Sequence, residues 1–180
     1  MSGKMLVLFA KWTGHVLSAA TVTAIPTTPL TADTLAGTAL PLRKLPGSTV
    51  AVELSLAIPT EELDVKLVDI CLQVLENPFL YEIGSDGHPM QLPVPLPEPK
   101  IAFVSGDPSK LTVTLPALPA ATGLNVLVCE NRLAPDAAEA QRTVTVDQSN
   151  IPTATVTTDV PGPRTVLALV AGYPLVVATV

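Results

Sequence analysis

The sequence predicts an all-β protein built from two linked antiparallel β-sandwich-like modules. β-Branched residues are abundant: Val, Thr and Ile number 22, 21 and 6, so 49 of the 180 residues suit a pleated surface. Apolar residues recur mainly with a period of two, which is typical of strands. The 19 prolines exclude a helical bundle or a coiled coil, because proline interrupts helices.

The N-terminal module, residues 1–92, begins with a predicted hairpin. Met5–Lys11 and His15–Thr23 flank a turn in which Gly14 suits a left-handed backbone. A long Pro- and Thr-rich insert, residues 24–47, follows without clear periodicity. Because segments of this length without regular structure are uncommon, we expect either an arm along a neighbouring subunit or a loop that wraps its own module.

Two further segments of this module alternate as strands do. Thr49–Ala57 is a predicted strand. In Leu63–Leu75, two apolar sets of opposite parity meet at Leu67 and Val68, a phase slip that a β-bulge produces. The alternative is a helix from Glu61, because a Pro-Thr-Glu-Glu sequence is typical of a helix start.

The second half of the chain predicts an immunoglobulin-like module, residues 100–180. Phe79–Ile83 is a short predicted strand before the turn Gly84–Gly87, and clustered prolines then mark 93–99 as an extended Pro-rich linker. Seven short strands separated by turns follow, which is the number in a small β-sandwich. These strands are Ile101–Val104, Leu111–Leu115, Leu124–Glu130, Arg142–Val146, Thr153–Thr157, Val166–Ala171 and Leu175–Val180.

The final predicted strand is the strongest candidate for an interaction site. Leu175–Val180 contains no charge, no Gly and no Pro, a profile that natural proteins avoid on an open sheet edge. We therefore expect it to be buried or paired with another chain. The candidate interaction residues are Leu175, Val176, Val177 and Val180, together with Trp12 at the hairpin turn.

The low content of charged residues, their acidic balance and the lengths of the uncharged stretches argue against membrane-spanning, secreted and nucleic-acid-binding proteins. Charged residues make up 14% of the chain, against about 25% in ordinary soluble domains. Gly and Pro interrupt every long uncharged stretch, so no membrane span is expected. The apolar run Met5–Ala10 is too short for a secretory signal, and we expect a cytoplasmic location or a place in an assembled particle. Ten basic residues in an acidic chain argue against nucleic-acid binding.

Catalytic and cofactor chemistry has little support. His15 and His88 lie in or beside predicted turns, so we expect solvated imidazoles. There is no close Cys pair and no His pair at helical spacing, so we expect no metal and no cofactor. Cys71 and Cys129 have a spacing that an inter-sheet disulfide could have, but buried free thiols are the preferred interpretation. The sequence therefore predicts that the chain is not an enzyme.

These observations favour a structural or adaptor subunit of a larger protein assembly. Interface cores are depleted of charge, so a subunit covered by neighbours tolerates few ionised side chains. In composition alone, the chain is similar to tail, baseplate and decoration proteins of phage-like particles. The alternative is a monomeric ligand-binding sandwich, of the cell-surface or carbohydrate-binding type, that uses the turns around Trp12 and His88.

Overall fold

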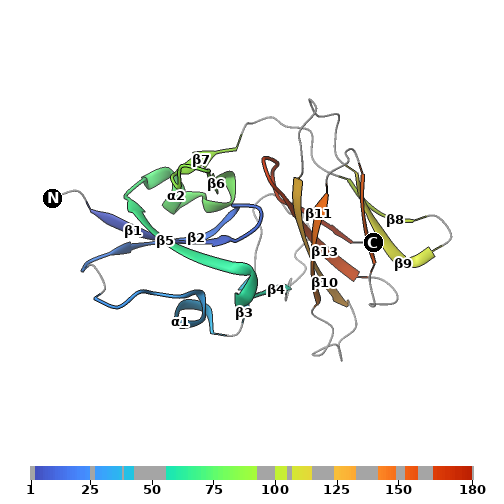
Figure 1. Ribbon diagram of the computed structural model, residues 1–180, viewed down its shortest axis with the longest axis horizontal. Helices are drawn as coiled ribbons and strands as arrows, with labels where there is room; N and C mark the ends of the chain where they lie inside the picture. The colour runs from blue at the N-terminus through green and yellow to red at the C-terminus, as the bar shows by residue number, and fades with distance from the viewer. Residues whose placement is uncertain are drawn as a thin grey trace.

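The computed structural model confirms a chain made mostly of strands. It describes residues 3–24, 27–37, 39–42, 56–92, 100–104, 107–114, 124–132, 142–148, 153–157 and 164–179. All strand pairs in these ranges are antiparallel, and the helices are few and short (Figure 1). Residues 25–26, 38 and 43–47 of the insert, residues 49–55 of the next predicted strand, the linker 93–99 and Val180 lie outside the described residues.

A three-stranded sheet with the order β2-β1-β5 forms the centre of the N-terminal part. Its strands are β1 (Lys4–Ala10), β2 (Val16–Val22) and β5 (Leu63–Asp69). The predicted β1–β2 hairpin is confirmed, with Gly14 at φ +76° in the turn. Their register shifts between Leu8, which pairs with Ser18, and Phe9, which pairs with Val16. Leu17 is therefore the extra residue of a β-bulge.

Both faces of this sheet are covered. Leu8 and Ala32 belong to one buried cluster, whereas Val7 and Val74 belong to another. Because Leu8 and Val7 are neighbours on β1, their side chains leave opposite faces of the sheet, and the two short α-helices cover one face each (Figure 1). The helical elements are α1 (Ala32–Ala36), α2 (Leu72–Glu76) and the 3₁₀ turns η1 (Thr60–Glu62) and η2 (Pro78–Leu80).

The predicted bulge at Leu67 and Val68 is wrong. β5 pairs with β1 in one unbroken register. Leu63 lies in the cluster that contains Ala32, whereas Val68 lies in the opposite cluster, so the change of parity reflects a strand buried on both faces. A continuous helix from Glu61 is wrong as well, because only a 3₁₀ turn precedes β5 and the α-helix begins after it.

All seven strands predicted for the second half are present. They form a four-stranded sheet of order β11-β10-β13-β14 and a three-stranded sheet of order β12-β9-β8. Two smaller pairs, β3–β4 and β6–β7, complete the described strands. The additional strands are β3 (Ala39–Leu42), β4 (Leu56–Pro59), β6 (Tyr81–Ile83), β7 (Pro89–Gln91), β8 (Lys100–Val104), β9 (Asp107–Thr114), β10 (Leu124–Arg132), β11 (Arg142–Gln148), β12 (Thr153–Thr157), β13 (Arg164–Val170) and β14 (Val176–Thr179).

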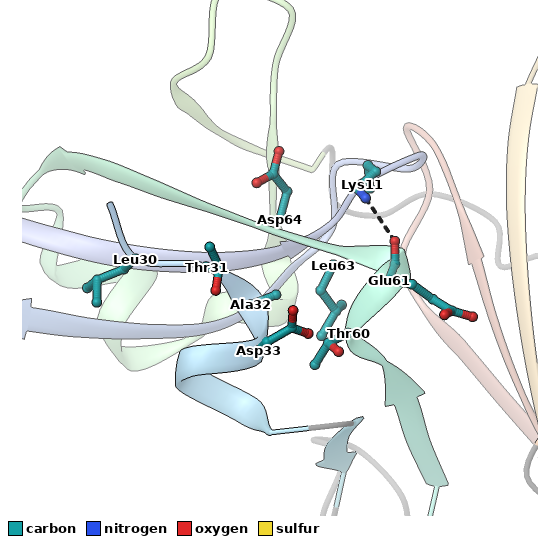
Figure 2. Close-up of a pocket in the computed structure, with 9 residues that line it drawn as sticks. All are labelled: Lys11, Leu30, Thr31, Ala32, Asp33, Thr60, Glu61, Leu63 and Asp64. Carbon is teal, nitrogen blue, oxygen red and sulfur yellow. Dashed lines mark hydrogen bonds between the residues drawn. The ribbon is translucent and has the colours of Figure 1, made fainter. Parts of the chain in front are cut away.

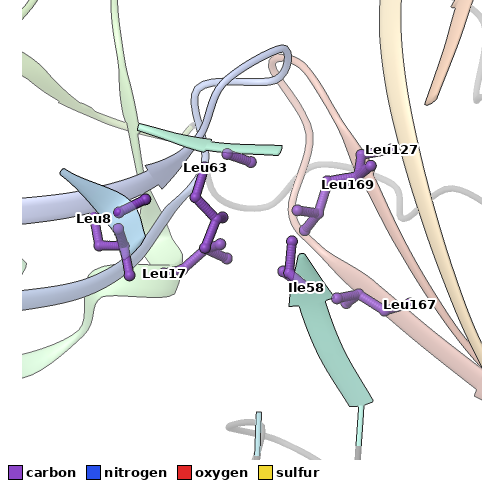
Figure 3. Packing of buried hydrophobic residues seen from close by; sticks show 9 residues of the cluster. Leu8, Leu17, Ile58, Leu63, Leu127, Leu167 and Leu169 are labelled. Carbon is purple, nitrogen blue, oxygen red and sulfur yellow. The ribbon is translucent and has the colours of Figure 1, made fainter. Parts of the chain in front are cut away.

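One hydrophobic cluster joins the two halves of the chain. It contains Leu8, Leu17 and Leu63 of the N-terminal sheet together with residues of the four-stranded sheet, and Figure 3 shows Ile58 of β4 beside the latter. The residues from the four-stranded sheet are Leu127, Leu167 and Leu169. Every residue from Val166 to Val170 is fully buried, so β13 is covered on both faces. The four-stranded sheet is therefore a middle layer of the molecule.

Candidate functional site

The predicted interaction strand lies at a sheet edge. β14 pairs on one side with β13, where Val176 is opposite Ala168 and Val177 is opposite Leu167. It is the last strand of the four-stranded sheet, and no strand among the described residues pairs with its other side. An edge strand presents unpaired backbone N–H and C=O groups, which can bind a further strand.

Two side chains at the start of this strand pack within the molecule. Leu175 and Val177 pack against the cluster that joins the two halves. Val176 points to the opposite face and is half-buried, and Val180 lies outside the described residues. The backbone groups of its free edge are therefore the feature of β14 that could bind another strand.

Trp12 and His88 are not brought together. Trp12 lies at the tip of the β1–β2 hairpin and is 50% exposed. His88 is exposed, as predicted, and its charge helps to lower the pKa of Asp69, although the main cause is the hydrogen bond from Lys4. Because Lys4 and Asp69 pair at the far end of β1 from the hairpin tip, the two predicted turns do not form one site.

A cavity of about 510 Å³ opens between α1 and the start of β5 (Figure 2). Its rim carries the carboxylates of Asp33, Glu61 and Asp64, and Lys11 donates a hydrogen bond from Nζ to the backbone oxygen of Glu61 at 2.8 Å. In the described part of the chain, no group of three or more His, Cys, Asp or Glu could hold a metal ion. The cavity is therefore a hollow with an acidic rim.

A buried polar cluster lies at the place where two hairpin turns meet, and the sequence did not indicate it. The expected solvated imidazole of His15 is wrong, because this side chain is fully buried. Its Nε2 lies 2.7 Å from the backbone oxygen of Tyr173, in the turn between β13 and β14. Its Nδ1 lies 3.0 Å from Oγ1 of Thr13 in its own hairpin. Burial lowers the pKa of His15 to about 4.

Strand β6 supports the same junction. His15 forms an isolated antiparallel bridge with Glu82, and the Ile83 N–H donates to the Gly14 oxygen at 2.8 Å. The Glu82 carboxylate accepts the N–H of Gly172 at 2.9 Å. We call this cluster of Thr13, His15, Glu82, Gly172 and Tyr173 the turn junction. The two hairpins have similar sequences, but nothing in those sequences indicates that their turns touch.

Cys71 is a free, half-buried thiol, so the alternative of a disulfide to Cys129 is wrong.

Comparisons with protein families, with curated proteins and with solved structures found no match for this chain. Among the described residues, none of the helices has the length and apolar character needed to cross a membrane.

Proposed function

We propose that this chain is a non-enzymatic structural or adaptor subunit, which joins a larger protein assembly by adding a strand from another subunit to the edge of β14. The observation that carries the proposal is an uncharged, mostly apolar strand at the open end of the four-stranded sheet. Tail, baseplate or decoration subunits of phage-like particles are the kind of assembly that the composition favours.

Comparison with the other edges supports this choice. Charged side chains and Pro protect exposed edges from pairing with other chains. β5, β6, β8 and β11 contain a charge, and β3, β4 and β7 contain Pro. The edge strand β12 contains neither, but three of its five residues are Thr, whereas three of the four residues of β14 are apolar. β2 has no charge, but α2 and η2 pack against it. β14 has neither charges nor such a covering element among the described residues. Strand addition at β14 would satisfy its free backbone groups without introducing a buried charge.

We also propose that β8–β14 form a single immunoglobulin-like sandwich. The two sheets, of orders β12-β9-β8 and β11-β10-β13-β14, have the Greek-key distribution of strands between a three-stranded and a four-stranded layer. In that arrangement β14 is the last strand of the sandwich. Its free edge would then be the natural point for extending the sheet into a neighbouring subunit.

A lysine on β14 tests the proposal. Val176→Lys places a charge on the edge without removing a contact to the shared cluster. Thr21→Lys is a matched control at an exposed position of β2, the edge strand against which α2 and η2 pack. We expect light scattering to show concentration-dependent association for the native chain and for Thr21→Lys, with a loss of at least tenfold in apparent affinity for Val176→Lys.

The contrary result is equally clear. The proposal would be contradicted if the native chain stays an 18.7 kDa monomer at high concentration and also captures no host protein whose binding is weakened by Val176→Lys. Circular dichroism of both variants verifies that the strands remain folded.

A further inference from the structure

Two hairpin turns from opposite ends of the chain are held together at one buried imidazole. His15 follows the turn of the β1–β2 hairpin, and Tyr173 belongs to the turn between β13 and β14. Nε2 of His15 lies 2.7 Å from the backbone oxygen of Tyr173, although the two residues are 158 positions apart in the sequence. This contact therefore joins the N-terminal part to the four-stranded sheet, beside the hydrophobic cluster that both share.

The hydrogen bonds define the protonation state of His15. A backbone carbonyl can only accept a hydrogen bond, so Nε2 must carry the proton that is donated to Tyr173. In the neutral imidazole, Nδ1 is then an acceptor, and the hydroxyl of Thr13 donates to it at 3.0 Å. The neutral ring consequently satisfies both nitrogens within the turn junction.

A second proton would disturb this arrangement. Nδ1 would become a donor, so the Thr13 hydroxyl would have to rotate until its oxygen accepts the bond that it now donates. The new charge would also be fully buried, because His15 is 0% exposed, and burying a charge is costly unless a partner compensates it.

The charged groups around the ring do not compensate this charge without cost. From its own hairpin, Lys11 is a cation whose Nζ is bonded to the Glu61 oxygen. From β6, the Glu82 carboxylate already accepts the Gly172 N–H. From the other turn, burial raises the pKa of the Tyr173 phenol, which therefore stays neutral. Because both ring nitrogens face Thr13 and Tyr173, a hydrogen bond from an imidazolium to Glu82 would require the ring to leave one of these partners, so that response also loosens the junction.

We propose that His15 is an acid-sensitive latch: its neutral imidazole holds the β13–β14 turn against the β1–β2 hairpin, and its protonation releases that turn while the hydrophobic cluster keeps the sheets together. The released turn leads directly into β14. Acid would thus loosen the start of β14, and with it the edge of the four-stranded sheet, without unfolding the chain.

The direction and the pH range follow from linkage. The pKa of His15 is about 4 in the closed junction and 6.5 in an open, solvated one. The open form therefore binds one more proton between these values, so opening becomes more favourable as the pH falls through this range. Above pH 6.5 neither form is protonated, and the closed junction keeps its full stability.

Amide hydrogen exchange on the full chain measures how readily the β13–β14 turn opens at each pH. The Gly172 N–H, which is bonded to Glu82, reports on opening of the turn, and amides in the β1–β5 and β10–β13 ladders report on the rest of the molecule. After correction for intrinsic exchange rates, we expect Gly172 protection to fall about tenfold per pH unit between 6.5 and about 4. Protection in the two ladders should change less than twofold.

Two substitutions separate His15 from other titrating groups. His15→Gln can still donate an amide N–H to Tyr173 but cannot be protonated, so Gly172 protection should become independent of pH. His88→Gln removes an exposed imidazole and should reproduce the native profile. An unchanged pH dependence in His15→Gln would assign the effect to another group, such as Glu82, and overturn the proposal.

A measurement on the native chain keeps the proposal testable if His15→Gln does not fold. Nitrogen-15 NMR of the imidazole should show the Nε2–H tautomer at pH 7, and the Gly172 amide shift should move together with ring protonation. A ring that titrates near 6.5, as a solvated histidine does, or a Gly172 amide that does not respond to ring protonation, would refute the latch.

Discussion

At the scale of single residues, the turn junction contains one polar atom that the fold does not satisfy. The hydroxyl of Tyr173 is buried and has no hydrogen-bond partner in the described part of the chain, although its backbone oxygen accepts the bond from His15. A buried hydroxyl without a partner costs roughly 1–3 kcal/mol of desolvation. The side chain of Tyr173 therefore stabilises the junction by the packing of its ring and not by its hydroxyl group.

Removing this hydroxyl should stabilise the chain. For Tyr173→Phe we expect the free energy of unfolding, measured by urea denaturation, to rise by about 1 kcal/mol. The backbone contact to His15 is unaffected by this substitution, so the acid response of the junction should be retained. A loss of stability of similar size would show that the hydroxyl has a partner in solution.

The glycines of the two turns differ in their surroundings. Gly14 and Gly172 both have a positive φ, +76° and +80°. A Cβ added at Gly14 would lie 2.9 Å from the backbone oxygen of Ile83, whereas one added at Gly172 would meet nothing within 4 Å. The first hairpin thus approaches β6 too closely for any side chain.

This difference predicts unequal costs for the same substitution. Gly172→Ala should lose about 1–2 kcal/mol of stability, because the left-handed backbone is unfavourable for alanine. Gly14→Ala should lose at least about 1 kcal/mol more, because the close approach to Ile83 adds to the same backbone cost. Urea denaturation of the two variants gives the comparison, and equal losses would contradict the close approach.

At the scale of elements, local patterns in the sequence were sufficient for most strands. Alternation and turn residues predicted the first hairpin, the turn at Gly87, which has φ +80°, and all seven strands after the linker. These features depend on residues close together in the chain. The uncharged final strand was likewise visible in sequence, and its place at a sheet edge follows from the strand order.

Features that depend on distant partners could not be predicted in the same way. The phase slip in β5 has the same sequence signature whether it comes from a bulge or from burial on both faces, and only the opposite packing of Leu63 and Val68 distinguishes the two. His15 precedes an apolar strand in a manner typical of an exposed turn residue. Its burial depends on Tyr173, which no local pattern connects to it.

At the scale of the whole molecule, the shortage of charge has two sources. Part of it reflects the middle layer, because β13 is buried on both faces and needs apolar residues at consecutive positions. Burial within the chain does not account for all of it, since Leu72 and Ile70 near α2 are 64% and 40% exposed. We propose that the rest of the shortage reflects coverage by neighbouring subunits, as the proposed function requires.

The shared hydrophobic cluster also predicts how the molecule unfolds. Leucines from the N-terminal sheet and from the four-stranded sheet belong to one cluster, which includes Ile58 of β4 at 0% exposure. Neither half can therefore lose its packing without exposing apolar surface of the other. We expect one cooperative transition, in which fluorescence of Trp12 in the first hairpin and far-ultraviolet circular dichroism of all the strands change together.

Truncation of Ile58 tests this coupling, because its side chain is buried in the cluster that contains both groups of leucines. Ile58→Ala should lower the free energy of unfolding by about 2–5 kcal/mol through lost burial and the resulting cavity, and it should shift the fluorescence and dichroism transitions equally. Leu72→Ala, at a side chain that is 64% exposed, is the matched control and should move neither by more than about 0.5 kcal/mol. Separate transitions in the native chain, or an Ile58→Ala shift confined to one probe, would mean that the two halves unfold independently and that the cluster does not couple them.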